Sequence, residues 1–348
     1  MPTTSIDTFF ACTIIVAVAL IATAFLASMM QTSINSTQNI NEDSYLKALA
    51  DHIITNSGTP INWGISSSVP VDFGLAAISS TIPYELDIDK VTRLNNMNNN
   101  SLSYFDLENS AKLGNIAFGI TVSQIMSINI AQSSNRTVGN DLFFTFTILT
   151  SIDSKPTDAN LKCYVVSNNY QSNMSNSSSG IGVGFLTVQM PSDSANQALL
   201  IVFARASMDD RITSYAVYNF QNSTQESVTS NDIVSLTPLN YTLSLITNST
   251  DLIIQNSYLF SYSYQQNLAP AQGISQFLVP KLIDKSPYIL LICGYNNSDY
   301  FQEWTSYPQV PLKSGSNFEN SERNVFSYVV MINNVLYKID ESFGSVAS

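Results

Sequence analysis

Leu142-Phe143-Phe144-Thr145-Phe146-Thr147-Ile148 is the stretch that decides the fold of most of this 348-residue chain. Every second residue in it is large and apolar, and the residues between them are mostly polar. A period of two matches the alternation of side chains across a β-strand with one buried face. The same period runs through residues 116–122 and 126–130. The sequence therefore predicts a β-rich body that begins at Ile116.

Further strand-like runs follow along the chain, over residues 161–166, 181–190, 198–205, 212–220, 241–247, 252–255, 258–264 and 287–293. The last apolar residues predict a hairpin with Asn333-Asn334 as its turn, because asparagine tolerates the positive φ of a two-residue type I′ turn. Asp209-Asp210-Arg211 is also interpreted as a hairpin turn, and Asn173–Ser179 as a polar loop. Many short strands between Asn, Ser and Gly turns favour a mainly antiparallel, β-sandwich-like body, built from one sandwich or from two packed side by side.

Phe9–Met30 is a run of 22 residues without a charge. A helix of that length rises about 33 Å, enough to cross the roughly 30 Å hydrocarbon core of a bilayer. Ala22-Thr23-Ala24 offers a small-x-small site, so a cleaved signal peptide is the alternative. The run is longer than the apolar core of a signal peptide, and no Lys or Arg precedes it. We therefore expect a retained transmembrane α-helix.

The rest of the chain contains no second apolar run of this kind, which predicts a single-pass membrane protein with an extracytoplasmic body. Apolar residues at helical spacing over 45–54 predict a second, amphipathic helix that ends before Gly58 and Pro60. The expected organisation is a membrane helix with its amphipathic extension over residues 1–57, an irregular connector with short helices over 58–115, and the β-rich domain over 116–348.

The composition excludes some functions. The net charge is −12, and only 11% of residues are charged, where soluble domains average about 25%. A nucleic-acid partner needs a basic surface, which this acidic chain does not supply. Asparagine is abundant, with 35 residues. Such a weakly charged but hydrogen-bonding surface is typical of secreted and cell-surface proteins.

Nine N-x-S/T sequons mark possible glycosylation sites, although about eight are expected by chance at this composition. They lie at Asn35, Asn99, Asn135, Asn173, Asn176, Asn222, Asn240, Asn248 and Asn296. Cys12 lies in the membrane segment, which leaves Cys163 and Cys293 for one disulfide in an oxidising compartment. Both sit in apolar runs, where a buried free thiol is an equally natural interpretation.

The sequence shows no catalytic constellation, and we expect no enzymatic activity, metal or cofactor. The single histidine, His52, is interpreted as a solvent-facing helix residue. Glu85, Asp87 and Asp89 alternate and could offer oxygen ligands to Ca²⁺ on one face of an extended segment. The glycine and the distal glutamate of a calcium loop are missing, so a solvated acidic strand or turn is favoured. The two tryptophans, Trp63 and Trp304, are assigned to packing.

Three segments carry a resemblance to a known family. They are Ser5-Ile6-Asp7-Thr8-Phe9-Phe10-Ala11 at the start of the apolar run, Gly58-Thr59-Pro60-Ile61-Asn62-Trp63-Gly64 with Phe73-Gly74-Leu75-Ala76, and Asp89-Lys90-Val91-Thr92-Arg93-Leu94. Together they cover roughly the first 95 residues. They resemble archaeal type IV pilin-like surface proteins with class III signals, in which an apolar N-terminal helix carries an exported β-rich head.

The resemblance implies a role for Asp7, because an acidic residue near mature position five assists subunit docking in pilins. Asp7 takes that position only if processing occurs after Pro2, and the basic residue usual before such a site is absent. Ala19, Thr23 and Ala27 lie on one i, i+4 row, where small residues would let a second helix approach closely, although ordinary apolar filler is an equal interpretation.

The expected function is thus a membrane-anchored structural or interaction subunit, a minor pilin or filament accessory. Its partners would be the bilayer, through residues 9–30, and copies of itself or related subunits. The alternative is a cell-surface binding module or adhesin that recognises a glycan or a protein.

Overall fold

The computed structural model describes residues 16, 20, 21, 23–26, 28, 43–78, 80–114, 116–168, 170–178, 181–192, 197–221, 234–246, 252–271, 275–281, 284–296, 299–316, 318 and 323–345. The chain divides into two compact units, Met1–Asp51 and His52–Ser348. Most of the predicted membrane segment, residues 9–30, lies outside the described residues, and those of its residues that are described are helical. Within the described parts of the chain, we find no helix with both the length and the apolar character that a bilayer crossing needs.

The predicted amphipathic helix is present over residues 43–55. Its buried face carries Leu46, Ala50, Ile53 and Ile54, all at most 3% exposed. The i, i+4, i+7, i+8 spacing of these residues places them on one stripe of the helix. The helix ends before Gly58, which has a φ of +73°.

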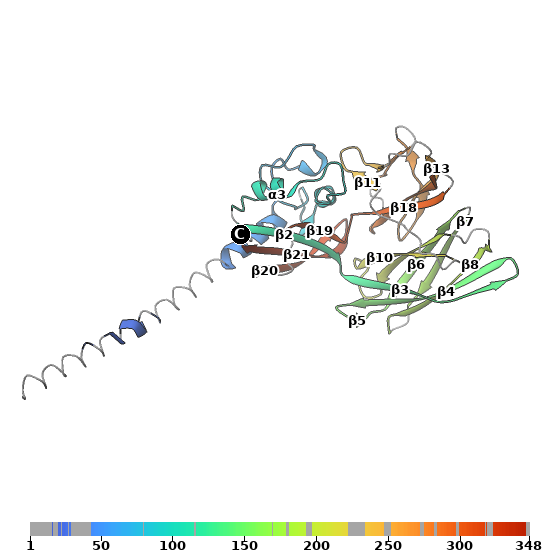
Figure 1. Cartoon of the computed structure of the whole chain (residues 1–348), viewed down its shortest axis with the longest axis horizontal. Coiled ribbons are helices and arrows are strands. Elements are labelled where there is room, and N and C mark those ends of the chain that lie inside the picture. The colour runs from blue at the N-terminus through green and yellow to red at the C-terminus, as the bar shows by residue number, and fades with distance from the viewer. Residues whose placement is uncertain are drawn as a thin grey trace, which may run out of the picture. The chain divides into compact units, whose positions relative to one another are not determined.

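The body contains a five-stranded sheet that we call the base sheet (Figure 1). Its order is β1 (Glu85–Leu86), β20 (Arg323–Ile332), β21 (Val335–Ser345), β2 (Ile116–Gln124) and β19 (Leu312–Gly315). Only the β1–β20 pair is parallel. The connector therefore shares a sheet with the C-terminal hairpin. It also holds the 3-10 helix η1 (Trp63–Ile65) and the helices α2 (Ile88–Thr92) and α3 (Tyr104–Ser110).

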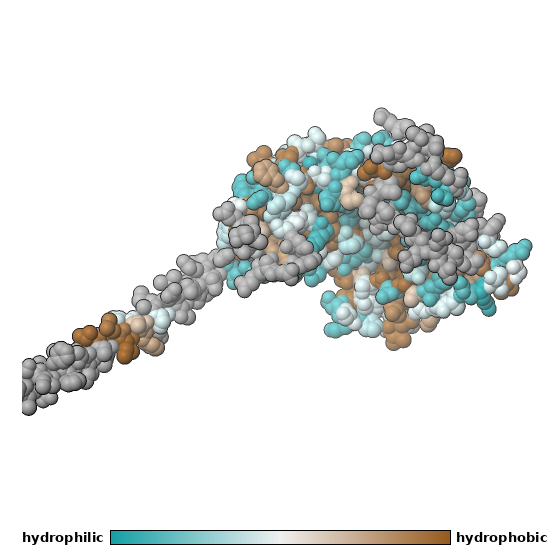
Figure 2. All heavy atoms as spheres, viewed as in Figure 1, coloured by the Kyte–Doolittle hydropathy of each residue, from teal (hydrophilic) through white to brown (hydrophobic). Residues whose placement is uncertain are grey.

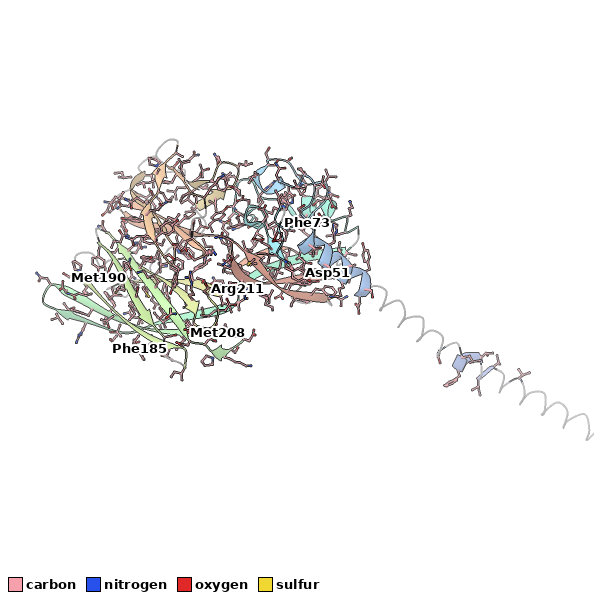
Figure 3. The ribbon with its side chains drawn as sticks, turned by 180° about the vertical axis from the view of Figure 1, so that it is seen from behind. Asp51, Phe73, Phe185, Met190, Met208 and Arg211 are labelled. Carbon is pink, nitrogen blue, oxygen red and sulfur yellow. The ribbon has the colours of Figure 1, made fainter. Side chains whose placement is uncertain are left out.

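Two further sheets form the first sandwich. One joins β3 (Met126–Val138), β4 (Asp141–Ile152), β5 (Lys155–Pro156) and β8 (Val183–Pro191), and the other has the order β10 (Thr213–Phe220), β9 (Ala198–Ala206), β6 (Ala159–Ser167) and β7 (Tyr170–Ser177). Alternation along β8 illustrates the packing: Met190 lies in the core between the sheets, whereas Phe185 is 64% exposed (Figure 3). Residues of β4, β6, β8 and β9 make most of this core, together with Met126 of β3 and Phe220 of β10.

Another pair of sheets forms the second sandwich. One has the order β14 (Gln265–Asn267), β13 (Leu252–Phe260), β17 (Tyr288–Asn296) and β18 (Asp299–Tyr307), and the other β11 (Val234–Thr237), β12 (Thr242–Leu245), β16 (Gln276–Leu278) and β15 (Ala269–Pro270). Their common core holds residues of β11, β12, β13, β16, β17 and β18.

The two sandwiches pack against each other through β9 and β17. In β9, Leu200 and Val202 face the core of the first sandwich, and Leu199, Ile201 and Phe203 face the second. The residues of β17 alternate in the same way between the second core and this interface. Strands buried on both faces carry continuous apolar runs rather than alternating ones. Burial of each large apolar side chain stabilises the fold by about 1.5–3 kcal/mol. The packing of the four sheets against one another is therefore a large contribution to the stability of the body.

The predicted mainly antiparallel, sandwich-like body is confirmed by these ladders. The C-terminal hairpin is confirmed as well: Ile332 pairs with Val335, and Asn333 and Asn334 have φ of 49° and 64°. The predicted turn at 209–211 connects β9 to β10, and the carbonyl of Arg211 accepts a 2.9 Å hydrogen bond from Leu336 N of the hairpin (Figure 3). The predicted polar loop was wrong over residues 173–177, because these residues pair with β6 as part of β7.

Candidate functional site

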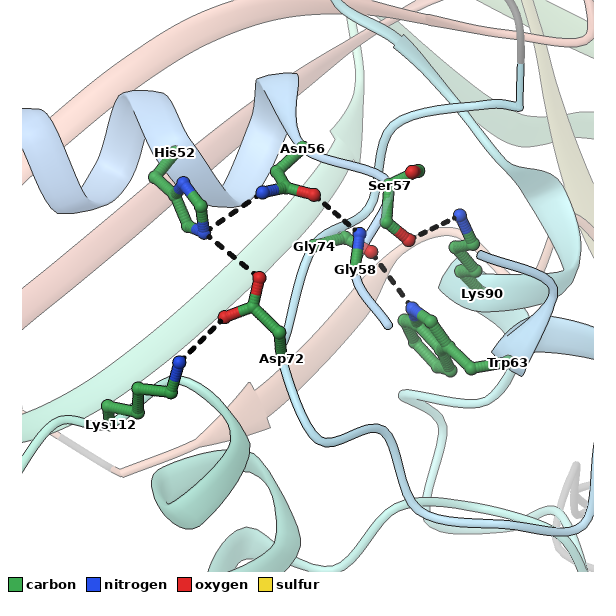
Figure 4. Close-up of polar contacts among 9 residues, drawn as sticks. All are labelled: His52, Asn56, Ser57, Gly58, Trp63, Asp72, Gly74, Lys90 and Lys112. Atoms are coloured by element: carbon green, nitrogen blue, oxygen red, sulfur yellow. Dashed lines mark hydrogen bonds and ion pairs between the residues drawn. The ribbon is translucent and has the colours of Figure 1, made fainter. Parts of the chain in front are cut away.

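The candidate site is a set of buried contacts where the 43–55 helix ends. Gly58, Trp63, Gly74, Lys90 and Arg93, which lie in separate segments of the sequence, meet there (Figure 4 shows the contacts of the first four). We call these five residues the post-helix clamp. The segments that carried the family resemblance after residue 57 are thus brought together in space.

Lys90 ties two segments of backbone together. Its side chain is fully buried, and its Nζ donates 2.8 Å hydrogen bonds to the carbonyls of Ser57 and Ala76. Burial lowers the pKa of the Lys90 ammonium, while Asp87 acts in the opposite direction. Bonds from a charged donor are stronger than neutral ones, so this pair of contacts fixes the chain just after the helix.

Arg93 and Trp63 form the other half of the clamp. The Trp63 indole N–H donates to the carbonyl of Gly74 at 3.0 Å, and the Arg93 guanidinium lies 5.5 Å from the indole centroid. Arg93 also donates to the carbonyls of Trp63, of Ser68 at 3.1 Å and of Asn100 at 2.9 Å. One buried side chain therefore holds three backbone segments.

The two glycines of the clamp, Gly58 and Gly74, and the adjacent Gly64 allow close backbone contact. A Cβ on Gly74 would lie 2.3 Å from the carbonyl oxygen of Asn56, and one on Gly64 would lie 2.7 Å from the backbone nitrogen of Lys90. Gly58 combines such crowding with a left-handed backbone. These positions need hydrogen in place of a side chain.

A polar cluster on the surface flanks the clamp. Nε2 of His52 lies 3.5 Å from Asp72 Oδ2 and 3.2 Å from Asn56 Nδ2, and Lys112 Nζ lies 3.4 Å from Asp72 Oδ1 (Figure 4). The predicted exposure of His52 is confirmed, at 45% of its side chain. Exposed ion pairs of this kind contribute about 0–1 kcal/mol. The contacts with Asp72 and Asn56 orient the imidazole of His52.

Asp89 connects the connector to the second sandwich. It is 8% exposed and accepts hydrogen bonds from Tyr307 at 2.7 Å and Tyr241 at 2.9 Å. Burial raises the pKa of the Asp89 carboxyl, although both tyrosine bonds act to lower it. Asn98 supports the same junction by donating to Thr92 O and accepting from Leu236 N.

The interpretation of Glu85, Asp87 and Asp89 as a solvated acidic strand or turn was wrong for Asp89, which is buried, whereas Glu85 and Asp87 are half-buried. Glu85 lies in β1, Asp87 caps α2 by accepting from the backbone of Asp89 and Lys90, and Asp89 is buried. The three carboxylates therefore serve three different structural purposes. Over the described residues, no group of three or more His, Cys, Asp or Glu side chains could hold a metal ion.

Of the four residues assigned to assembly, Asp7, Ala19 and Ala27 lie outside the described residues. Thr23 is helical and exposed, and its hydroxyl donates to the carbonyl of Leu20 at 2.9 Å.

The possible glycosylation sites fall on several elements. Asn99, Asn135, Asn173 and Asn240 are exposed, and Asn296 is half-buried. Asn176 lies in β7, and Asn35, Asn222 and Asn248 are outside the described residues.

The possible disulfide between Cys163 and Cys293 is not formed: both thiols are free and buried. Cys163 belongs to the core of the first sandwich, whereas Cys293 Sγ contacts the carbonyl of Asn256 at 3.6 Å in the second. Burial raises the pKa of Cys163 to about 12 and that of Cys293 to about 11. The alternative interpretation, two buried free thiols, is the one that the structure has.

A shallow groove of about 290 Å³ lies beside β13. A bulge between Ile254 and Asn256 shapes it, and Gly294 permits the bulge because a Cβ there would lie 2.1 Å from the carbonyl of Ile253. The lining contains amides and aliphatic groups with one phenylalanine, from residues 254–257, Asn267, Leu268, Pro270 and Phe277. An aromatic platform of Trp or Tyr, which would favour glycan binding, is not part of this lining.

Sequence reasoning found the clamp residues only through a resemblance and did not foresee their partners, which are backbone carbonyls. No known protein family matches the chain, and no curated protein matches it. Among solved structures, HBP35 of Porphyromonas gingivalis is similar with 13% identity and a TM-score of 0.20, over 52% of this chain and 63% of its own. Human GIVD cytosolic phospholipase A2 is similar with 10% identity and a TM-score of 0.14, over 66% of this chain and 33% of its own. The chain thus spans less than two thirds of each of these proteins, and neither TM-score is high enough to show a shared fold.

Proposed function

We propose that this protein is a membrane-anchored, extracytoplasmic structural or interaction subunit of the pilin-like kind. The observation that carries the proposal is the exposure of large apolar side chains in the N-terminal unit (Figure 2). Their exposed fractions run from 57% to 70%, at Val16, Leu20, Ile21, Phe25 and Leu26. An uncharged helix that exposes such residues needs an apolar environment, which the hydrocarbon core of a bilayer provides.

The clamp supports an anchoring role for the first part of the chain. An anchor transmits force to its body only if the chain that joins them is fixed. Lys90 fixes the carbonyl of Ser57, two residues after the end of the 43–55 helix, and Gly74 packs on Asn56. Within the body, the chain from Asn56 to Gly58 is therefore held by buried contacts.

In this proposal the bilayer is one partner, through residues 9–30, and copies of the protein or related subunits are the others. The body acts by contact on the extracytoplasmic side, as a minor or accessory component rather than a major pilin. Its weakly charged, asparagine-rich composition suits such a surface.

Replacement of Leu20 by Lys tests the anchor. A lysine at the centre of a membrane helix costs about 2.5–3.5 kcal/mol on insertion scales, so we expect this variant to leave the alkali-washed membrane fraction. The matched control is Leu149→Lys, at an exposed leucine of β4 in the body, which should stay in the membrane fraction with the wild type. Retention of Leu20→Lys in the membrane would refute the anchor.

Mass spectrometry of the N-terminus of the native protein then shows whether the chain is unprocessed, processed as in pilins, or cleaved and secreted. A protein that starts at Met1 is an unprocessed anchor, and one that starts at Thr3 is a processed pilin-like subunit. A protein that starts beyond Ala27 is secreted, which contradicts the proposal.

A further inference from the structure

Over the described residues, the outer edge of β20 has no strand partner along most of its length. β21 pairs with all of β20 on one side, but β1 covers only Met331 and Ile332 on the other. Over the described parts of the chain, no strand pairs with the remainder of this edge. A two-residue turn at Asn333-Asn334 directs the backbone groups of even-numbered β20 residues toward β21 and those of odd-numbered residues outward. Met331 follows this pattern, because its N–H donates outward to the carbonyl of Tyr84 at 3.0 Å.

The side chains of this edge do not protect it. Val325 is 46% exposed and Val329 is 56% exposed, and Arg323 is the sole charged residue of the strand. Natural edge strands are usually protected by charges, prolines or bulges. The register of β20 with β21 runs from Arg323 to Ile332 without a bulge. The open edge can thus accept another extended strand.

The sequence of the open edge is self-complementary. Val325-Phe326-Ser327-Tyr328-Val329 has the same order of aliphatic, aromatic and serine side chains in both directions. We propose that β20 pairs antiparallel with β20 of a second copy of this chain, across a two-fold axis at Ser327. Val325 then lies opposite Val329 and Phe326 opposite Tyr328, and the outward groups make about six backbone hydrogen bonds. Such isologous pairing is the usual form of a homodimer interface.

The neighbouring charges agree with this pairing. β1 occupies the edge from Met331 onward, so the paired segment ends at Val329. In this register Arg323 of the second copy would fall opposite Met331, which Glu85 already pairs with, so the second strand leaves the edge beside the Glu85 carboxylate, which also accepts from the Ser80 hydroxyl. An unrelated strand would meet the same edge without this symmetric match. The pairing does not require membrane residence, although confinement to a bilayer would raise the effective concentration of the partner strand.

Cysteine cross-linking of the full-length chain tests the pairing. In a Cys12→Ser background, Ser327→Cys places two thiols opposite each other in a hydrogen-bonded pair, where the Cα–Cα distance of about 5.5 Å suits a disulfide. The control is Ser175→Cys, at an exposed serine of β7, the edge strand of another sheet. In oxidised detergent samples on non-reducing gels, we expect about tenfold more dimer from Ser327→Cys than from Ser175→Cys. Equal yields would overturn the proposal.

A second variant distinguishes specific strand pairing from disulfides that form when two molecules collide at random. Val329→Lys in the Ser327→Cys background adds a charge to the edge at an exposed position, which should leave the melting temperature unchanged and reduce the dimer about tenfold. Val138→Lys, at a valine of β3 that is 54% exposed, is the matched control and should leave the dimer yield unchanged. A dimer yield that Val329→Lys does not reduce would contradict the proposed register. Because the samples are in detergent, the cross-linking result does not depend on membrane insertion. A negative result would therefore contradict the strand pairing and not the membrane anchor.

Discussion

Replacement of Gly74 by Ala should strongly destabilise the body, because the added methyl group has no space. The new Cβ would lie 2.3 Å from the carbonyl oxygen of Asn56, where contacts under 3.0 Å essentially never occur. The other near atoms are also backbone, so no flexible side chain can move aside. The Asn56 carbonyl would have to retreat by at least about 0.7 Å, and such overpacking costs about 1–3 kcal/mol.

That movement would disturb two further contacts. The Asn56 carbonyl accepts a 2.9 Å hydrogen bond from Ala76 N, and the next carbonyl, of Ser57, accepts one from Lys90. Loss of a neutral bond costs about 1 kcal/mol, and loss of one to a charged group about 1.5–3 kcal/mol. We therefore expect Gly74→Ala to lower the free energy of unfolding by about 3.5–7 kcal/mol, a large part of the 5–15 kcal/mol typical of a domain.

Equilibrium urea unfolding of the detergent-solubilised chain measures this change, with Trp63 of the clamp as one of two fluorescent tryptophans. Gly139→Ala is the control, because Gly139 has a φ of +62° but no heavy atom within 4 Å of an added Cβ. Alanine at this left-handed position destabilises the folded state but also restricts the unfolded chain, which partly offsets the loss. We expect a net loss of about 1 kcal/mol in the free energy of unfolding. The reasoning fails if Gly74→Ala loses less than about 1 kcal/mol, or no more than Gly139→Ala.

Three other predictions follow from single residues. Burial raises the pKa of Asp89 above 3.8, so its contribution to stability is complete below about pH 4 and is lost as the pH rises through the folded-state pKa. Asp89→Asn should flatten that loss in urea titrations from about pH 4 to 7, and an unchanged pH profile would contradict this. Asn334→Val, at a φ of 64°, should cost about 1–2 kcal/mol in the same titrations, while Asn334→Gly should cost nothing. Cys163 and Cys293 should resist a thiol reagent at about pH 8 in the native protein and react in urea, because burial raises the pKa of both; rapid labelling of the native protein would show that they are accessible.

The sequence could predict strands where one face of a strand is buried. In β4, Leu142, Phe144, Phe146 and Ile148 alternate with more exposed residues, and this alternation is visible in the sequence. It could not predict residues 173–177 of β7, which are polar apart from Met174. That strand lies at the edge of its sheet and forms through backbone bonds to β6, which do not depend on side-chain type.

The clamp was only partly predictable for a similar reason. The segments that contain Trp63, Gly74 and Lys90 stood out in the sequence, but the groups that Lys90 binds are the carbonyls of Ser57 and Ala76. Every residue has a carbonyl, so the sequence carries no signal for such partners. Lysine and arginine are also rarely buried, and their polar character would place Lys90 and Arg93 on the surface.

The base sheet has a consequence for how this protein can change during evolution. β2 leads out of the base sheet and β19 leads back into it, and the two strands are direct neighbours, with Val122 opposite Leu312. Both sandwiches lie between these two points, over residues 126–307. Their two connections to the base are therefore separated by one strand spacing, about 4.8 Å. An insertion whose ends are this close can be lengthened or shortened without separating the two strands that flank it. We expect relatives of this protein to keep the base sheet and the post-helix clamp. They should differ most in the segment between β2 and β19, which holds both sandwiches.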